Sequence, residues 1–212
     1  MNQITRETTS RRDFLRVALA AAVPLVLALG GGTALYAASA AAVPLPLTPA
    51  CIDDDDDAEA TPQQTEGPYF TPSSPERTSL LEPDMAGTKI VVSGSVLART
   101  CQPVAGALID VWQADDRGEY DNVGYQLRGH QFTDEQGRYV LETVIPGLYP
   151  GRTRHFHLKV QAPNRPILTT QLYFPDEPAN RRDGIYRPEL LLDVQDGADG
   201  KLGRFDFVLD LA

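Results

Sequence analysis

Short apolar segments separated by turn residues recur along the chain from residue 89 onward. Residues 89–97 are rich in β-branched side chains and partly alternate between apolar and polar. Residues 107–112 are almost continuously apolar, which is typical of a buried strand. Four further segments have strand character, namely 138–144, 155–161, 168–174 and 204–211. No long stretch has the helical period, so the pattern predicts an all-β protein, a single sandwich of mixed or antiparallel strands.

The first 43 residues have a different character. Ser10-Arg11-Arg12-Asp13-Phe14-Leu15 precedes an apolar run from Val17 to Leu29, and small residues follow. An arginine pair before a weakly apolar run predicts a twin-arginine export signal over residues 1–43. The alternative is a retained transmembrane anchor, which Pro24 within the run disfavours. We therefore expect a secreted or cell-envelope protein that meets a membrane only through this segment.

Residues 44–66 are expected to form an acidic, proline-rich linker, because a run of aspartates such as Asp53 to Asp57 is usually solvated. The remaining residues, 67–212, suffice for one catalytic domain with a single core. Cys51 and Cys101 are the only two cysteines. An even number in an exported protein predicts a disulfide between them, with two free thiols as the alternative.

Net charge excludes one class of partner. The chain carries 19 basic and 29 acidic residues, a formal charge of −10. A polyanion would be repelled by this balance, so we expect no nucleic-acid partner.

The strongest chemical signal is His155-Phe156-His157, which holds two of the three histidines in the chain. Alternate side chains of a strand point to the same face about 7 Å apart along the chain, so both imidazoles can reach one ion. Tyr149 stands six positions before His155, and Tyr120 lies in a polar loop after residues 107–112. A phenolate is a hard anionic ligand, which makes ferric iron the candidate cofactor. The alternatives are a zinc or copper protein that uses only the two histidines, and a secreted binding module without catalysis.

Several motifs occur together in one order, and by them the chain resembles the intradiol ring-cleavage dioxygenases. They are Thr65-Glu66-Gly67-Pro68-Tyr69, residues 103–107 and 110–114, Gly118-Glu119-Tyr120, residues 133–139, Pro146-Gly147-Leu148-Tyr149-Pro150, residues 152–157 and Thr170-Gln171-Leu172-Tyr173-Phe174. The resemblance implies a β-sandwich with long active-site loops. It also implies cleavage of a catechol-type ring between its two hydroxylated carbons, with O2, to a cis,cis-muconate-type diacid.

The resemblance also assigns residues. It implies that Tyr120, Tyr149, His155 and His157 bind Fe(III), and that Tyr120 leaves the metal when the diol binds and takes a proton. Arg152 would stabilise negative charge on the ring. Gln171 and the Gly67-Pro68-Tyr69 segment would contact the substrate. Tyr125 is a rival to Tyr120 but lacks the Gly-x-Tyr context, and His130 has no ligand counterpart, so we expect it to be structural.

Two departures from the family pattern bear on specificity. The segment between Tyr149 and His155 is short, and the helical dimerisation region of the catechol enzymes has no counterpart in the signal and linker. The identity of the diol and the formation of a homo-oligomer therefore stay open at this point.

Overall fold

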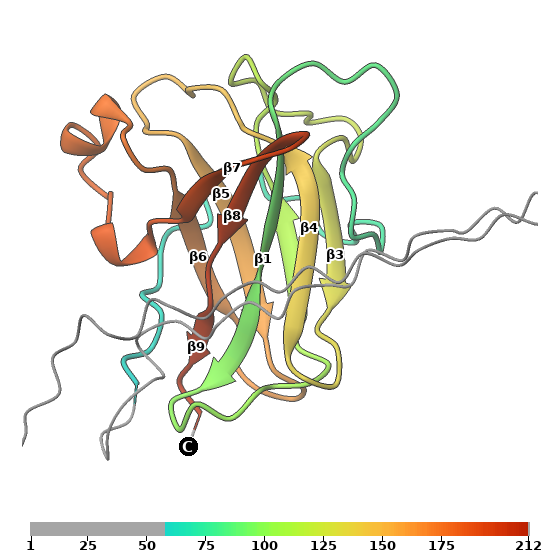
Figure 1. Cartoon of the computed structure of the whole chain (residues 1–212), viewed down its shortest axis with the longest axis vertical. Coiled ribbons are helices and arrows are strands. Elements are labelled where there is room, and N and C mark those ends of the chain that lie inside the picture. Colours follow the sequence, from blue (N-terminus) through green and yellow to red (C-terminus); the bar gives the residue numbers. More distant parts are fainter. Residues whose placement is uncertain (1–57, 212) are drawn as a thin grey trace, which may run out of the picture. The chain divides into compact units, whose positions relative to one another are not determined.

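The computed structural model describes residues 58–211, which form a sandwich of two β-sheets (Figure 1). The first sheet has the order β4-β1-β8-β7, with β9 also paired to β1, and the second has the order β3-β2-β5-β6. The strands are β1 (Lys89–Ala98), β2 (Leu108–Trp112), β3 (Arg128–Phe132), β4 (Arg138–Val144), β5 (His155–Gln161), β6 (Leu168–Tyr173), β7 (Asp193–Gly197), β8 (Gly200–Arg204) and β9 (Phe207–Leu209). Two short 3-10 helices, η2 (Pro178–Arg181) and η3 (Pro188–Leu190), lie between β6 and β7.

The core lies between the two sheets and follows the alternation of the strands. Ile90 and Val92 of β1 and Ile109 and Val111 of β2 are 1% exposed or less and belong to one hydrophobic cluster. In β5, Phe156, Leu158 and Val160 join this cluster. The intervening residues of β5 therefore point to the outer face of the second sheet.

The segment from residue 58 to about residue 80 covers that outer face. Pro62 accepts a hydrogen bond from the Thr170 hydroxyl, and Gln64 donates its backbone N–H to the carbonyl of Thr169, both in β6. Further along, Pro75 accepts the backbone N–H of His130 in β3. The segment thus crosses the whole sheet, and it turns the outer face into a second enclosed layer.

Most predicted strands are confirmed, because β1, β2, β4, β5 and β6 match the expected segments to within one or two residues. The expected strand at 204–211 is shorter in the structure and is represented by β9. Three strands were not predicted: β3, β7 and β8. Their sequences are polar or glycine-rich and do not alternate between apolar and polar residues in the way that predicts a strand. They are RGHQF, DVQDG and GKLGR.

The folded part begins earlier than residue 67, where the sequence placed the start of the domain. Ala58 donates its N–H to the carbonyl of Arg99, and Thr61 donates to the carbonyl of Val208, so residues 58–66 are packed. The expected export signal at 1–43, the remainder of the expected linker and Cys51 lie outside the described residues. The predicted Cys51–Cys101 pairing therefore stays a prediction. Within residues 58–211 no helix is long and apolar enough to cross a membrane.

Gly94 marks the point where β1 changes partner. Residues 90–93 pair in parallel with β8, and residues 96–98 pair with β9. Between them Ser95 donates its N–H to the carboxylate of Asp206, and a Cβ at Gly94 would lie 1.7 Å from the carbonyl oxygen of Phe205. Only glycine allows the chain to cross so closely at this switch.

We predict that Gly94→Ala lowers the free energy of unfolding by more than about 2 kcal/mol, because the backbone of residues 205–206 must move away. Gly184→Ala is the matched control, since a Cβ there meets nothing within 4 Å. Urea denaturation of both variants measures the effect. Equal stabilities of the two variants would contradict this account of the strand switch.

Candidate metal centre

His155 and His157 lie on the outer face of β5, with side chains that are almost fully buried. Their Nε2 atoms are 3.1 Å apart. The Nδ1 of His155 lies 2.6 Å from the carbonyl oxygen of Thr153. A carbonyl can only accept, so this Nδ1 carries the proton and Nε2 of the neutral ring keeps its lone pair. Trp112 of β2 stacks on the ring of His157 at 5.0 Å and 8°. Both rings are therefore held in place before any ligand arrives.

The electrostatics of the site favour neutral imidazoles. Burial, together with the charge of Arg152, lowers the pKa of His155 to about 4. Burial also holds the pKa of His157 well below its ordinary value, and His155 and Arg152 act in the same direction. At neutral pH both rings are unprotonated, which is the state that binds a metal.

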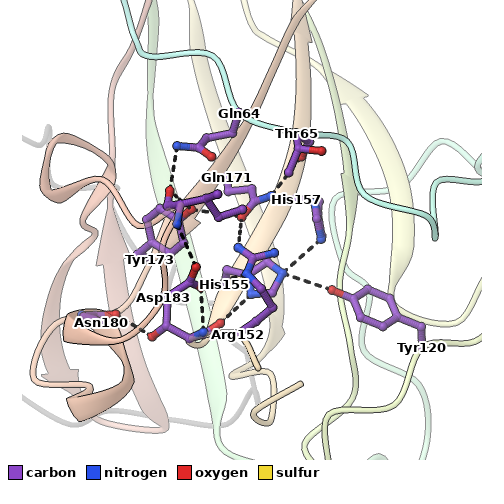
Figure 2. Close-up of polar contacts among 12 residues, drawn as sticks. Gln64, Thr65, Tyr120, Arg152, His155, His157, Gln171, Tyr173, Asn180 and Asp183 are labelled. Atoms are coloured by element: carbon purple, nitrogen blue, oxygen red, sulfur yellow. Dashed lines mark hydrogen bonds and ion pairs between the residues drawn. The ribbon is translucent and has the colours of Figure 1, made fainter. Parts of the chain in front are cut away.

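Tyr120 directs its hydroxyl at the histidine pair, with its oxygen 3.4 Å from Nε2 of His155 (Figure 2). Donor atoms about 2.1 Å from one ion, at angles of about 90–110°, lie about 3.0–3.4 Å from one another. The observed separations of 3.1 and 3.4 Å match that spacing. Both neighbours of His155 Nε2 therefore stand at the spacing expected of ligands that share one cation with it.

Tyr149 lies beside this group. Its ring meets the ring of Tyr120 edge-on, with centroids 5.9 Å apart, and its hydroxyl forms a 2.8 Å hydrogen bond with the hydroxyl of Tyr69. Tyr69 in turn stacks on Tyr120 at 4.5 Å. The structure therefore gathers three tyrosines, and the oxygen of Tyr149 has Tyr69 as its hydrogen-bond partner.

Two of the phenol groups, those of Tyr120 and Tyr69, have a raised pKa and are protonated at neutral pH unless a cation is present. Burial raises the pKa of Tyr120 above its ordinary value, although the positive charges of Arg152 and Arg128 oppose this. The hydrogen bond to Tyr149, followed by burial, raises the pKa of Tyr69. A bound trivalent cation would reverse the balance at Tyr120, because it stabilises the phenolate directly.

Two glycines explain how Tyr120 and Tyr149 reach the same place. Gly118 and Gly147 both donate their N–H to the carbonyl of Asp115, at 3.1 and 2.6 Å. A Cβ on Gly118 would lie 2.3 Å from the carbonyl oxygen of Leu148, and a Cβ on Gly147 would lie 2.3 Å from the nitrogen of Gly118. The two loops thus touch backbone to backbone, and each tyrosine follows two residues after its glycine.

Arg152 and Gln171 form a polar wall next to the histidines. Nη2 of Arg152 donates to Oε1 of Gln171 at 2.6 Å, and Gln171 stands opposite His157 in the ladder between β5 and β6. Gln171 is completely buried and donates its amide to the carbonyl of Thr65 at 2.9 Å. The covering segment therefore fixes the glutamine that holds the arginine (Figure 2).

The Gly67-Pro68-Tyr69 segment lies over the imidazole of His157. Gly67 has φ of 71°, and a Cβ there would stand 3.2 Å from Cε1 of His157. Pro68 is exposed and shares a turn with Tyr69. The expected metal-binding, catalytic and substrate-binding residues are thus brought to one end of the second sheet, with Pro68 at its surface.

The two other residues weighed in the sequence lie in different surroundings. The hydroxyl of Tyr125 donates to the carbonyl of Pro72 at 3.0 Å. Nδ1 of His130 lies 3.1 Å from the hydroxyl of Ser74, which donates to Asp110. The Tyr125 hydroxyl fastens the covering segment to the loop before β3, and His130 fastens it to β3 itself.

Arg128 and Asp183 are parts of the site that were not predicted from the sequence. Arg128 is 1% exposed and donates to the carbonyls of Tyr69 (2.6 Å) and Asp121 (2.7 Å), which joins the segments that carry Tyr69 and Tyr120. Asp183 accepts from Nε of Arg152 at 2.8 Å. The only sequence signals are an arginine beside apolar Leu127 and an Asp-Gly turn. Neither reveals a partner that is distant in the chain.

The donor set suits a hard trivalent ion. In the described part of the chain no three His, Cys, Asp or Glu side chains are grouped for a metal, so an ion here would depend on tyrosine oxygens together with the two imidazoles. Anionic oxygen with neutral nitrogen is a combination that ferric iron accepts. Tyr120, His155 and His157 would hold the ion, and Tyr149 would complete the set after release from Tyr69.

We predict a pH effect on the stability of the metal-free protein. Below about pH 6.5 the unfolded chain protonates His155, whereas the folded protein takes up this proton only near pH 4. The free energy of unfolding should therefore fall across this window, by up to about 3 kcal/mol from this group, and level off below it. Urea denaturation of wild type and His155→Gln between about pH 7 and pH 4 measures the difference. Parallel curves for the two proteins would contradict the prediction.

Comparison with known proteins gives a consistent result. The sequence model of the family described as Dioxygenase matches residues 65–211. A hydroxyquinol 1,2-dioxygenase from Rhizobium sp. (strain MTP-10005) is 32% identical over 157 residues, which cover 61% of this chain and 53% of that protein. The chain thus spans about half the length of this relative. A chlorocatechol 1,2-dioxygenase from Pseudomonas sp. (strain P51) is 28% identical over 175 residues, which cover 69% of each chain.

Two solved structures have the same fold. The dioxygenase domain of a dioxygenase carbohydrate-binding protein fusion from Streptomyces sp. SirexAA-E is 55% identical, with a TM-score of 0.71, over 73% of this chain and 100% of that domain. The 3-chlorocatechol 1,2-dioxygenase from Rhodococcus opacus 1CP is 28% identical, with a TM-score of 0.66, over 72% and 73%. Because the family match covers most of the described domain and the sandwich is shared, the chain belongs to the intradiol dioxygenase family.

Proposed function

We propose that this protein is a non-haem Fe(III) dioxygenase that cleaves a catechol-type ring between its two hydroxylated carbons. The observation that carries the proposal is the convergence of two further donor atoms on Nε2 of His155, which lies 3.4 Å from the Tyr120 hydroxyl and 3.1 Å from Nε2 of His157. Both atoms of O2 would enter the product, a cis,cis-muconate-type diacid. Ferric iron, when bound, supplies the Lewis acidity that binds the diol as a dianion and the electronic coupling that lets its ring react with O2.

Tyr120 has the position of a proton acceptor in this scheme. A diol must lose two protons to chelate a metal, and a phenolate that leaves the metal becomes a base again. Burial raises the pKa of Tyr120, so once released from the metal its oxygen binds a proton strongly at neutral pH. Tyr149 would stay on the metal.

Arg152 has the position to stabilise negative charge on the ring. Its guanidinium is oriented by Gln171 and lies beside the imidazole of His155, whose pKa it lowers. A fixed cation directed at charge that develops in the transition state is typically worth a few kcal/mol. The backbone carbonyl of Thr153 meanwhile holds the proton of His155 at Nδ1.

The names of the relatives bear on the substrate class. They specify hydroxyquinol, chlorocatechol, catechol and protocatechuate, which all carry adjacent ring hydroxyls. We propose a diol of this class for the present chain. The segment between Tyr149 and His155 is short and departs from the family pattern at a place that bears on specificity. Experiment must therefore identify the ring substituents that the protein accepts.

The proposal predicts a coloured enzyme. Iron-loaded protein should be red-brown from tyrosinate-to-iron charge transfer, contain about one iron per chain, and consume O2 with a panel of catechols. Metal analysis, oxygen uptake and mass spectrometry of the products test these points together. A colourless iron-loaded sample, or a chain purified with zinc or copper alone, would refute the assignment.

A second prediction concerns Tyr149. Tyr149→Phe should weaken the visible band and lower kcat by at least about tenfold, because one phenolate donor is lost. Tyr125→Phe is the matched control, since its hydroxyl bonds to Pro72. Steady-state oxygen uptake and absorption spectra compare the two variants. Full colour and rate in Tyr149→Phe would remove this residue from the ligand set.

A further inference from the structure

A carboxylate that the resemblance does not assign lies behind the site. The side chain of Asp183, in the loop after η2, is only 3% exposed. Its Oδ2 accepts two hydrogen bonds, from Nε of Arg152 at 2.8 Å and from the backbone N–H of Thr153 at 2.9 Å (Figure 2). Its Oδ1 accepts the N–H of Ile185 at 3.1 Å. One buried carboxylate therefore contacts two consecutive residues of the loop that leads into β5.

Thr153 links this carboxylate to the histidines. It is fully buried, and its hydroxyl donates to Oδ1 of Asn180 at 2.5 Å. Its carbonyl oxygen is the acceptor for Nδ1 of His155 at 2.6 Å. Asp183 thus fixes the N–H of the same residue whose carbonyl sets the tautomer and the ring orientation of His155.

Arg152 depends on the same carboxylate. An arginine side chain has many rotamers, and fixing one of them costs conformational entropy. Contacts that fix the rotamer in the folded protein remove this cost from substrate binding. Nε of Arg152 donates a hydrogen bond to Asp183, and Nη2 donates one to Gln171 at 2.6 Å. The guanidinium is therefore held on two edges, and its plane is set before a substrate binds.

Asp183 is ionised in this setting. Burial disfavours its charge, but the N–H of Thr153 and the guanidinium of Arg152 outweigh burial, so the pKa of Asp183 is lowered. A negative charge at this point offsets the positive charge of Arg152 and keeps the pair compatible with a buried wall.

We propose that Asp183 is a positioning residue for the active site, which orients Arg152 directly and His155 through Thr153. The proposal rests on the ring-cleavage function proposed above. It assigns the 183 loop, 28 residues after His155 in the chain, a part in catalysis that goes beyond structural support.

Asp183→Asn and Asp183→Ala test the proposal. Asn keeps an acceptor for the N–H of Thr153 but loses the charge, whereas Ala loses both. We expect kcat of the iron-loaded protein to fall about tenfold in Asp183→Asn and about 100-fold in Asp183→Ala, with a smaller change in KM, because misplaced catalytic groups lower the rate of the chemical step. Asp196→Asn is the matched control, since this carboxylate is 88% exposed and pairs only with Lys201 in the described part of the chain.

Two readouts separate positioning from mere support of the fold. Asp183→Ala should lose iron to a chelator at least about tenfold faster than wild type, because a freed His155 is a poorer ligand. In metal-free protein, NMR should show that His155 no longer carries its proton only at Nδ1, and three histidines in the chain make the assignment tractable. Effects of Arg152→Ala and Asp183→Ala on kcat should also be less than additive.

The outcomes are distinct. Unchanged kcat, iron retention and His155 tautomer in a folded Asp183→Asn protein would overturn the proposal, and this variant decides the matter if Asp183→Ala does not fold. A wild-type protein that binds iron but cleaves no diol would refute the proposed function. The chelator and NMR comparisons would then still decide whether Asp183 positions His155.

Discussion

The candidate site depends on the two-residue alternation of β5. Phe156 and Leu158 point into the core between the sheets, so His155 and His157 must point to the opposite face. Pairing with β2 and β6 fixes the register, and a slip of one residue would bury the imidazoles in the apolar core. The same strand pairing and core packing that stabilise the sandwich therefore also hold the two nitrogen donors side by side.

A second requirement is that the outer face of this sheet be closed. The segment from residue 58 to about residue 80 does this, and it brings Gly67 against the ring of His157 and Thr65 against Gln171. Buried Arg128 ties the segment to the loop of Tyr120 through backbone carbonyls. Catalytic side chains from loops on a rigid scaffold are common, and here the loops are joined to one another as well.

Charge is distributed in the site in a way that suits its proposed task. Arg128 and Arg152 place two guanidinium groups near the phenol of Tyr120, whose pKa is raised by burial. The neighbouring phenol of Tyr69 has its pKa raised chiefly by its hydrogen bond to Tyr149. Asp183 offsets one of these charges, while Arg128 donates to the backbone carbonyls of Tyr69 and Asp121. The site is therefore set to receive anionic oxygen, which is what a metal-bound diol and phenolate present.

The sequence alone determined the sandwich, five of its strands and the site residues whose motifs have a local cause. In His-x-His, the two-residue period of a strand places both imidazoles on one face. The glycines before Tyr120 and Tyr149 are required because the two loops touch backbone to backbone. The sequence did not predict strands β3, β7 and β8. They are polar or glycine-rich, and they become strands because they pair with neighbouring strands of the folded sheets. The sequence did not predict the roles of Arg128, Thr153 and Asp183 for a related reason. Their hydrogen-bond partners are distant in the chain, and only tertiary packing decides which buried polar groups come into contact.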